Sequence, residues 1–206
     1  KNEFMWDVPT LILFFSDSEN FRKKIYPEYK GHRNRKKPCG YRKVISQLAE
    51  RYEVIRLPEL EADDAMGIYA TANVGNIICS PDKDMRQIPG KLYDMKEVHT
   101  IDPEEGAKWH LIQTLAGDQT DGYSGVPGIG VKRAVSLFEE HGYTWKTVVK
   151  AFEEKDLTEE DALLNARLAR ILTYTDYDPI EHTVIPWNPD ANYRADNGAI
   201  IQAEKA

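Results

Sequence analysis

The chain has 206 residues, of which 41% are hydrophobic and 30% are charged, with a formal net charge of −7. This composition is typical of a single globular domain with a sizeable core. No apolar run approaches the roughly 20 residues that a membrane span requires, and the first residues do not resemble a secretory signal. We therefore expect a cytoplasmic protein without a membrane partner. Cys39 and Cys79 lack the spacing of a zinc site or a disulfide framework.

The first hundred residues alternate short apolar runs with helical periodicity. The runs TLILFF (10–15) and NIICS (76–80) predict buried parallel strands, and EVIRL (53–57) predicts a weaker third strand. Apolar residues recur at helical spacing over 44–52 and 65–72. This order of elements predicts an α/β fold.

After residue 100 we expect the strands to stop and helices to follow. The predicted helices start at 102–105, lie near 131–140 and 144–154, and start again at a Thr158 cap. From Pro179 the periodicity is lost, which is typical of a poorly ordered end. The predicted division is an α/β core over 1–100, a helical region over 101–187 and a flexible tail over 188–206.

A glycine-rich turn is predicted within GDQTDGYSGVPGIGVKRA (117–134). The proline lacks an amide donor, and the glycines favour conformations that other residues avoid, so Gly125 to Gly130 cannot continue a helix. The helix that restarts at Val131 offers free amides, with Lys132 and Arg133 beside them. This pattern predicts a helical hairpin that holds a phosphate, with an ordinary helix-turn-helix connection as the alternative.

Basic residues are concentrated between Arg22 and Lys43, where Glu28 is the single acid. Because Lys and Arg hold nucleic-acid backbones, this basic strip favours a nucleic-acid partner despite the negative net charge. A solvated basic loop is the alternative.

Carboxylates gather in three motifs, EADD (61–64), SPDKD (80–84) and GDQTD (117–121), and one more acid follows the first strand. Ligands of an open parallel sheet bind beyond the carboxyl ends of its strands. Helix capping accounts for the EADD acids when that motif is taken by itself. The three motifs together gather so many like charges that they repel one another unless divalent cations compensate them. Carboxylate oxygens suit Mg²⁺ or Mn²⁺, so we expect these acids to converge in one metal-binding pocket. The acids are Asp17, Glu61, Asp63, Asp64, Asp82, Asp84, Asp118 and Asp121.

These motifs, preceded by FRxxxYPEYKGHR, resemble those of the flap endonuclease and 5'-nuclease superfamily, in particular the phage 5'-to-3' exonucleases of the T-seven group. The resemblance spans about Leu11 to Trp187. It implies a PIN/5'-nuclease-like parallel sheet with helices on both faces, a basic arch at about 20–43 and a helix-hairpin-helix at 117–134. It also implies a two-metal enzyme of phage replication or recombination, which hydrolyses duplex DNA from the 5' end in the host cytoplasm.

The resemblance assigns roles by position. Lys30 and Arg33 match catalytic basic residues near the scissile phosphate, and Tyr29 lies where a base could stack. The eight acids match the metal-site positions of the family. The glycine-rich turn matches the helix-hairpin-helix turn of the family, whose backbone carbonyls often bind a K⁺ ion that contacts a phosphate of the duplex. The implied DNA-binding positions are Tyr29, Lys30, Arg33, Arg35, Lys36, Lys37, Gly125, Gly128, Ile129, Gly130, Lys132 and Arg133.

One segment departs from the family pattern. Family members begin with a strand that ends in a metal-binding aspartate, and nothing in Lys1 to Pro9 matches it. We therefore expect the first strand of the fold to be missing, which leaves a catalytically silent DNA-binding homologue as an alternative. A structure-specific 5'-flap endonuclease and a PIN-type ribonuclease are further alternatives, although the ribonuclease would not need the GVPGIG turn. The expected partner is DNA with a 5' end, flap or nick. Whether RNA–DNA hybrids are also substrates, as in the removal of RNA primers, stays open.

Overall fold

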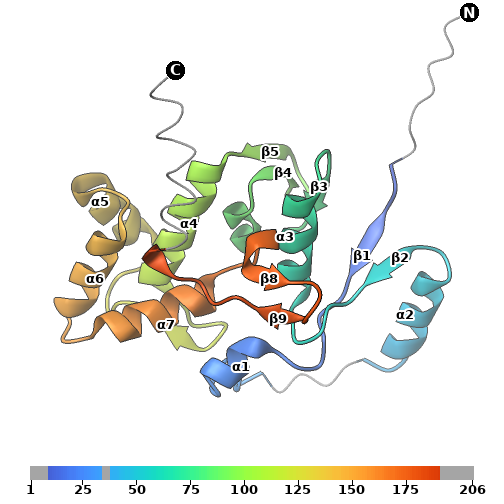
Figure 1. The fold of residues 1–206 in the computed structure, drawn as a ribbon, viewed down its shortest axis with the longest axis horizontal. Coiled ribbons are helices and arrows are strands. Elements are labelled where there is room, and N and C mark those ends of the chain that lie inside the picture. The colour runs from blue at the N-terminus through green and yellow to red at the C-terminus, as the bar shows by residue number, and fades with distance from the viewer. Residues whose placement is uncertain (1–8, 34–37, 191–206) are drawn as a thin grey trace, which may run out of the picture.

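A computed structural model describes residues 9–33 and 38–190 (Figure 1). Within those ranges, no helix is long and apolar enough to cross a membrane. The elements, with η for 3₁₀ helices, are β1 (Ile12–Phe14), α1 (Phe21–Ile25), α2 (Tyr41–Ala49), β2 (Glu53–Ile55), α3 (Ala62–Ala72), β3 (Ile77–Cys79), η1 (Lys83–Gln87), β4 (Gly90–Tyr93), β5 (Val98–Ile101), α4 (Pro103–Ala116), β6 (Gly117–Asp118), β7 (Tyr123–Ser124), α5 (Val131–His141), α6 (Trp145–Glu153), α7 (Glu159–Ala169), η2 (Tyr174–Asp176), β8 (Tyr177–Asp178) and β9 (Thr183–Val184).

The three predicted strands are confirmed as β1, β2 and β3. β1 pairs in parallel with β2, with Leu13 opposite Val54. β3 pairs in parallel with β4, with Ile78 opposite Leu92. Both ladders run through apolar residues, which suit the half-buried surface of a sheet. The α/β prediction is therefore confirmed.

The strand prediction needs correction in two respects, because it omitted two strands before residue 102 and because short strands also follow after it. β4 and β5 were not predicted, and they form an antiparallel pair at the edge of the β3 sheet. The residues of β5 alternate between exposed and more buried positions, so they lack the continuous apolar run that marked the other strands. Two short antiparallel pairs, β6–β7 and β8–β9, follow within the helical half.

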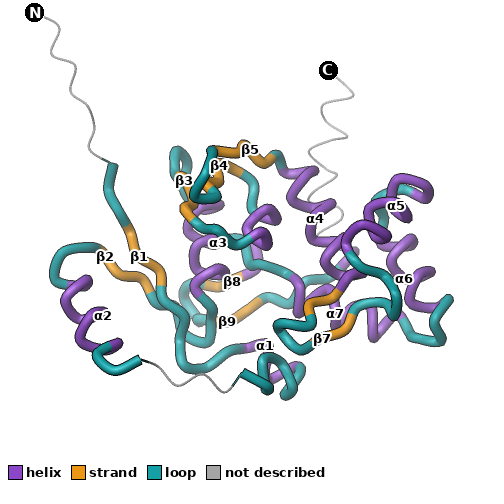
Figure 2. Tube along the Cα trace, turned by 180° about the vertical axis from the view of Figure 1, so that it is seen from behind, coloured by secondary structure: helices purple, strands orange, loops and turns teal. Residues whose placement is uncertain are grey.

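The parallel strands form two separate ladders instead of one continuous sheet. Within the described residues, β1 has only β2 as a neighbour, and β3 has only β4. Leu11 and Ile77, next to the free edges, remain about half exposed. Figures 1 and 2 both show β1, β2 and α2 at one end of the molecule, with α5 and α6 at the other.

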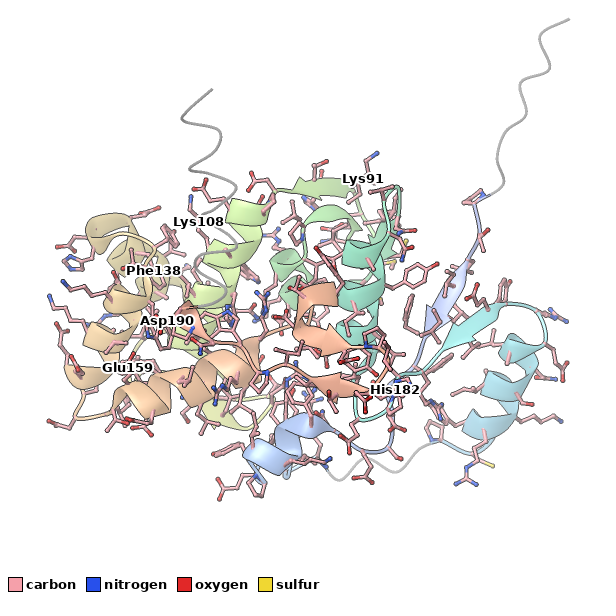
Figure 3. All side chains as sticks on the ribbon, in the orientation of Figure 1. Lys91, Lys108, Phe138, Glu159, His182 and Asp190 are labelled. Atoms are coloured by element: carbon pink, nitrogen blue, oxygen red, sulfur yellow. The ribbon has the colours of Figure 1, made fainter. Side chains whose placement is uncertain are left out.

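The largest hydrophobic cluster lies in the helical half, where α4 to α7 pack together. Phe138 of α5, labelled in Figure 3, is fully buried. Its ring stacks on that of Tyr143 with centroids 4.8 Å apart. Burial of such a side chain contributes about 1.5–3 kcal/mol. The predicted Thr158 cap of α7 is also confirmed, and it forms a capping box, because Asp161 N donates to Thr158 Oγ1 at 3.2 Å and Thr158 N donates to Asp161 Oδ2 at 2.8 Å.

Two glycines allow the GDQTD loop to leave α4 and return against it. Gly117 ends α4 with φ 64°, in the left-handed region, and a Cβ there would lie 2.0 Å from Gly125 N. A Cβ on Gly125 would lie 2.1 Å from Leu115 O. The backbone approach therefore requires glycine at both positions, and it fixes the acidic loop beside the end of α4.

Candidate active site

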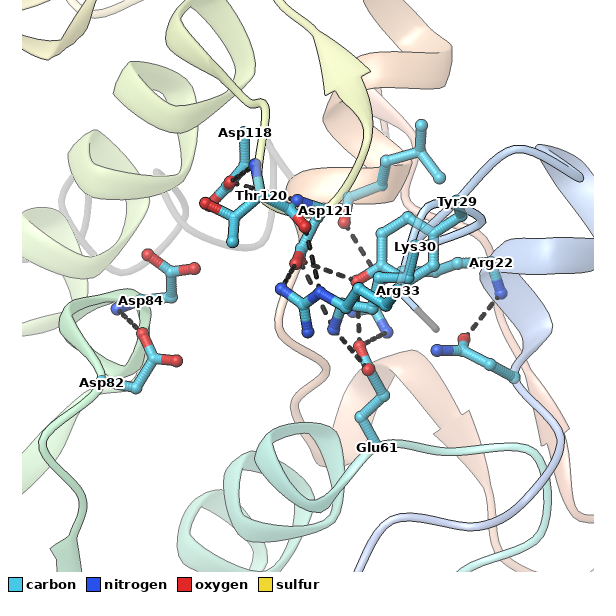
Figure 4. Close-up of polar contacts among 12 residues, drawn as sticks. Arg22, Tyr29, Lys30, Arg33, Glu61, Asp82, Asp84, Asp118, Thr120 and Asp121 are labelled. Atoms are coloured by element: carbon cyan, nitrogen blue, oxygen red, sulfur yellow. Dashed lines mark hydrogen bonds and ion pairs between the residues drawn. The ribbon is translucent and has the colours of Figure 1, made fainter. Parts of the chain in front are cut away.

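The predicted acids come from the start of α3, from η1 and from the β6–β7 loop, with the basic strip beside them. Figure 4 shows Asp82 and Asp84 on one side, and Glu61 and Asp121 among the basic side chains on the other. We call Glu61, Asp64 and Asp121 the paired carboxylates, since each contacts Arg or Lys. We call Asp63, Asp82, Asp84 and Asp118 the open carboxylates, since no Lys, Arg or His in the described ranges forms an ion pair with them.

Asp64 is held by Arg22, and both side chains are almost completely buried. Arg22 donates to the two Asp64 carboxylate oxygens at 2.7 and 2.8 Å, a bidentate geometry that strengthens the pair. Burial opposes the charge of Arg22, but Asp64 outweighs it and raises the Arg22 pKa well above its usual value. The guanidinium also donates to the carbonyls of Leu168 and Arg170, which ties the basic strip to the end of α7.

The predicted role of Asp64 as a metal ligand gains no support from this geometry. Its oxygens also accept from Glu61 N at 3.2 Å and Leu172 N at 3.2 Å, so both are occupied within the protein. Successive residues on a helix point about 100° apart, so Asp63 and Asp64 face different surroundings. Asp64 faces Arg22, whereas Asp63 lies in the electrostatic field of Asp82. The sequence motif alone did not reveal this division.

Glu61 and Asp121 hold the two predicted catalytic basic residues. Lys30 Nζ lies 2.5 Å from Glu61 Oε1 and 3.5 Å from Asp121 Oδ2, and Arg33 donates to Asp121 Oδ1 at 2.6 Å. Burial disfavours ionised Glu61, but Arg22 and Lys30 outweigh it and lower the Glu61 pKa. Lys30 N also donates to Asp121 O at 2.7 Å, which fastens the basic strip to the acidic loop.

The predicted stacking role of Tyr29 is wrong in this structure. The side chain is only 2% exposed, so its ring is not available to a base. Its hydroxyl lies 2.9 Å from Glu61 Oε2 and 3.0 Å from Asp121 Oδ2. Burial first, and then these two carboxylates, raise the Tyr29 pKa. Tyr29 therefore links Glu61 to Asp121.

The open carboxylates lie close enough to disfavour each other's charge. Burial first, then Asp82, raises the pKa of Asp63 to about 7. Burial first, then Asp82, also raises the pKa of Asp84 to about 6, and Asp118 adds to the effect. The Asp118 carboxylate accepts from the backbone N–H groups of Thr120 and Asp121. These shifts express the cost of burying carboxylates and of gathering their negative charges close together.

Within the described ranges, no three acidic, His or Cys side chains lie close enough to form a ready metal cage. The predicted convergence is therefore partial, with Asp84 and Asp118 coupled electrostatically and Asp64 turned into the core. The donor set nevertheless fits a hard divalent cation, because it consists of carboxylate oxygens whose charge lacks compensation. The open carboxylates are the residues that would hold such ions.

Asp17 contacts the loop that leads into α3. Its oxygens accept from Ser18 N at 2.8 Å and Glu59 N at 2.9 Å, and these backbone hydrogen bonds lower its pKa, the bond from Glu59 most. Asp17 thus fixes the loop before α3, and its predicted role as a metal ligand has no support from the observed contacts.

The glycine-rich turn presents part of the predicted DNA-binding surface. Gly128, Gly130, Lys132 and Arg133 are exposed at the start of α5, whose first turn has no side-chain cap. Two other predicted contact positions, Gly125 and Ile129, are buried, because they pack the turn against the helical core. Arg35, Lys36 and Lys37 lie outside the described residues.

Residues 5–110 match the family model of the 5'-3' exonuclease N-terminal, resolvase-like domain. The chain is 31% identical to the exodeoxyribonuclease of Enterobacteria phage T3 and 32% identical to the exonuclease of Escherichia phage T7. Both alignments cover 89% of this chain and 75% of the relative.

The chain belongs to the 5'-3' exonuclease family. The fold agrees, because it superposes on a T5 5'-exonuclease variant with a TM-score of 0.60 at 18% identity, over 79% of this chain and 74% of that one. A T5 flap endonuclease in complex with DNA and metal ions gives the same TM-score, identity and coverage. The prediction of this family and of its fold is confirmed.

Sequence reasoning missed three residues that organise the site of this 5'-3' nuclease. Arg22 was counted in the basic strip, but it is buried beneath the acids. Gln113 of α4 donates to Asp84, and Gln87 of η1 donates to Gln113. The position of Arg22 in the FRxxxYPEYKGHR motif was a usable signal, whereas nothing in the sequence marked the two glutamines.

Proposed function

We propose that this chain is a Mg²⁺- or Mn²⁺-dependent 5'-to-3' exonuclease that hydrolyses phosphodiester bonds of duplex DNA from the 5' end. The observation that carries the proposal is the juxtaposition of open carboxylates with Lys30 and Arg33. Burial first, and then the neighbouring carboxylates, raise the pKa values of Asp63 and Asp84, and the two basic side chains lie on the other side of the acidic site. Relatives from phages T3 and T7, both exonucleases by name, support the same activity.

The residues divide the chemical work between them. Divalent ions, when bound, would supply an acidified water and would neutralise the charge that develops on the phosphate. The open carboxylates supply the oxygens for these ions. Lys30 and Arg33 supply positive charge to the phosphate, and Glu61 with Asp121 holds them in place.

The exposed turn at 128–133 is proposed to bind the duplex backbone. Free amides at the start of α5 and the side chains of Lys132 and Arg133 suit phosphate oxygens, so sequence preference should be weak. A K⁺ ion at the turn is part of this proposal. Equal duplex affinity in potassium chloride and in tetramethylammonium chloride would show that no K⁺ ion at the turn contributes to DNA binding.

We also keep the proposed division into a nuclease core up to about residue 100 and a helical, DNA-binding region over 101–187. One hydrophobic cluster, packed among α4 to α7, lies wholly within the helical region, whereas the cluster built on the β3 sheet also includes Ile171 of that region. Contacts join the two parts, such as the hydrogen bond from Arg22 Nε to Leu168 O. The proposal therefore does not require either part to fold separately.

The direct test is incubation of 5'-labelled duplex DNA and 5'-flap DNA with and without Mg²⁺, followed by measurement of product length. The proposal expects labelled mononucleotides that form only with the divalent ion. A released flap of several nucleotides would favour a flap endonuclease, as in the T5 protein of similar fold. Binding without any product would leave a silent DNA-binding homologue, and cleavage of RNA–DNA hybrids would add primer removal.

A further inference from the structure

Two buried glutamines connect the open carboxylate Asp84 to the segment that follows α7. Gln113 of α4 is 6% exposed, and its Nε2 donates to Asp84 Oδ1 at 2.6 Å. Gln87, at the end of η1, is 2% exposed, and its Nε2 donates to Gln113 Oε1 at 2.6 Å. We call this chain of hydrogen bonds the amide relay.

The direction of the amide relay is fixed by the backbone at its far end. Gln87 Oε1 accepts from Ile171 N at 3.0 Å, and Gln87 Nε2 donates to Ala169 O at 2.7 Å. A backbone N–H can only donate, so the carbonyl of Gln87 must point toward Ile171 and its NH₂ toward Gln113. The Gln113 carbonyl then has to accept, which leaves the Gln113 NH₂ to face Asp84. The orientation of both amides thus follows from their partners.

The amide relay places a neutral donor on a carboxylate that has no cation partner in the described ranges. Asp64, Glu61 and Asp121 are held by Arg or Lys, and such a charge would compete with a divalent ion for the same oxygens. A neutral amide restrains Asp84 at one oxygen only, and the second oxygen stays free for another ligand. Hydrogen bonds to a ligand carboxylate from such outer partners fix its orientation toward a metal.

We propose that Gln113 is a positioning residue for Asp84, and that Gln87 fixes Gln113 in the donating orientation. The inference rests on the proposed function, since it assigns the relay to the divalent-ion site of that activity. Gln113 acts through Asp84 and does not itself hold the ion.

The test compares Gln113→Met, Gln87→Met and the exposed control Gln47→Met on α2 with the wild-type chain. Methionine has a similar length but lacks the amide. The measurements are Mn²⁺ binding by isothermal titration calorimetry without DNA, and cleavage rate as a function of Mn²⁺ concentration. We expect Gln113→Met to weaken Mn²⁺ binding roughly 10- to 100-fold, the usual cost of losing an outer partner of a metal ligand. Gln87→Met should cause a smaller loss, and Gln47→Met none.

The form of the activity loss separates positioning from a structural role. If Gln113 positions Asp84, saturating Mn²⁺ restores most of the cleavage rate of Gln113→Met. If the glutamine only stabilises the fold, the rate falls at every Mn²⁺ concentration with an unchanged midpoint, and the inference is overturned. Should Gln113→Met not fold, Gln87→Met decides by the same criterion, since it leaves Asp84 and Gln113 in place. A wild-type chain that binds no Mn²⁺ would contradict the proposed function itself. Equal Mn²⁺ binding by the wild-type chain and the variants would contradict only the role of the amide relay.

Discussion

The two sides of the candidate site carry similar carboxylates in opposite surroundings. On the side of the basic strip, Asp64 lies in a buried bidentate pair with Arg22, and Asp121 contacts Arg33. On the side of η1, Asp82 and Asp84 have no such partner in the described chain, and Asp84 receives only an amide hydrogen bond. The paired carboxylates form ion pairs with Arg or Lys, whereas the hydrogen bonds that Asp82, Asp84 and Asp118 accept within the described residues come from neutral groups.

This difference teaches that the partner of a carboxylate, more than its place in a motif, indicates its task. Asp63 and Asp64 are neighbours in EADD, yet Asp64 secures α3 to the core and the Asp63 pKa is raised to about 7. A carboxylate whose charge the fold leaves uncompensated is the better candidate for a metal ligand. Variants that change the two groups separately can break or sharpen this comparison.

The largest effect is expected for Asp84→Asn, which removes one open charge and keeps the acceptor for Gln113. Because a divalent ion stabilises the transition state by several kcal/mol, we expect Mg²⁺-dependent cleavage to fall at least about a thousandfold. Duplex affinity measured by fluorescence anisotropy should change less than about threefold. Glu104→Gln, which removes an exposed acid paired with Lys108, is the control and should cleave normally. Cleavage by Asp84→Asn at the wild-type rate would refute its role.

A smaller loss is expected when the paired side is changed through Lys30→Ala. Loss of one positive group near the reacting phosphate costs roughly 100-fold in kcat, with little change in binding. Single-turnover rates and equilibrium binding separate the two quantities. Lys24→Ala, at an exposed pair with Glu59, is the matched control. Equal losses of rate and affinity would make Lys30 a docking residue.

The double variant Lys132→Ala, Arg133→Ala tests the turn, which lies outside both carboxylate groups. We expect duplex affinity to fall roughly tenfold at moderate salt, and the slope of log affinity against log salt to decrease by about two. The cleavage rate at saturating DNA should stay close to that of wild type. Lys91→Ala, on β4, serves as the control (Figure 3). An unchanged salt slope would mean that the turn does not contact phosphate.

The smallest effect is a change of stability with pH in Asp63→Asn. The folded protein holds the Asp63 proton up to about pH 7, whereas the unfolded chain releases it near 3.8. This stabilisation is complete below about pH 4 and is lost as the pH rises through 7. In EDTA at pH 8, Asp63→Asn should therefore unfold with a free energy higher than that of wild type by a few kcal/mol at most, a gap that closes toward pH 4. Urea unfolding at several pH values measures the gap, and a gap independent of pH would contradict the assignment.

Much of the fold was readable from local pattern. The runs around β1 and β3 are continuous and apolar, which indicated strands, and the more polar run around β2 gave a weaker indication. β5 alternates and lies at an edge, and its pairing depends on β4, which no local signal specifies. The split into two ladders likewise depends on long-range pairing.

The candidate site was predictable in its composition and less so in its geometry. The motifs located the acids and the basic strip, because charged residues are conspicuous in a sequence. They could not show that Tyr29 and Arg22 are buried, since burial depends on how α1 packs against α7. The roles of Gln87 and Gln113 could not be predicted for a different reason. An uncharged amide acquires a role only from the groups that it contacts.

The central claim is that the open carboxylates, and not the paired ones, bind the divalent ions. Direct counting of bound Mn²⁺ by electron paramagnetic resonance tests it without DNA or catalysis. We predict bound Mn²⁺ in the wild-type chain and in Lys30→Ala, and loss of at least one ion in Asp84→Asn. Equal Mn²⁺ binding by wild type and Asp84→Asn would contradict the account.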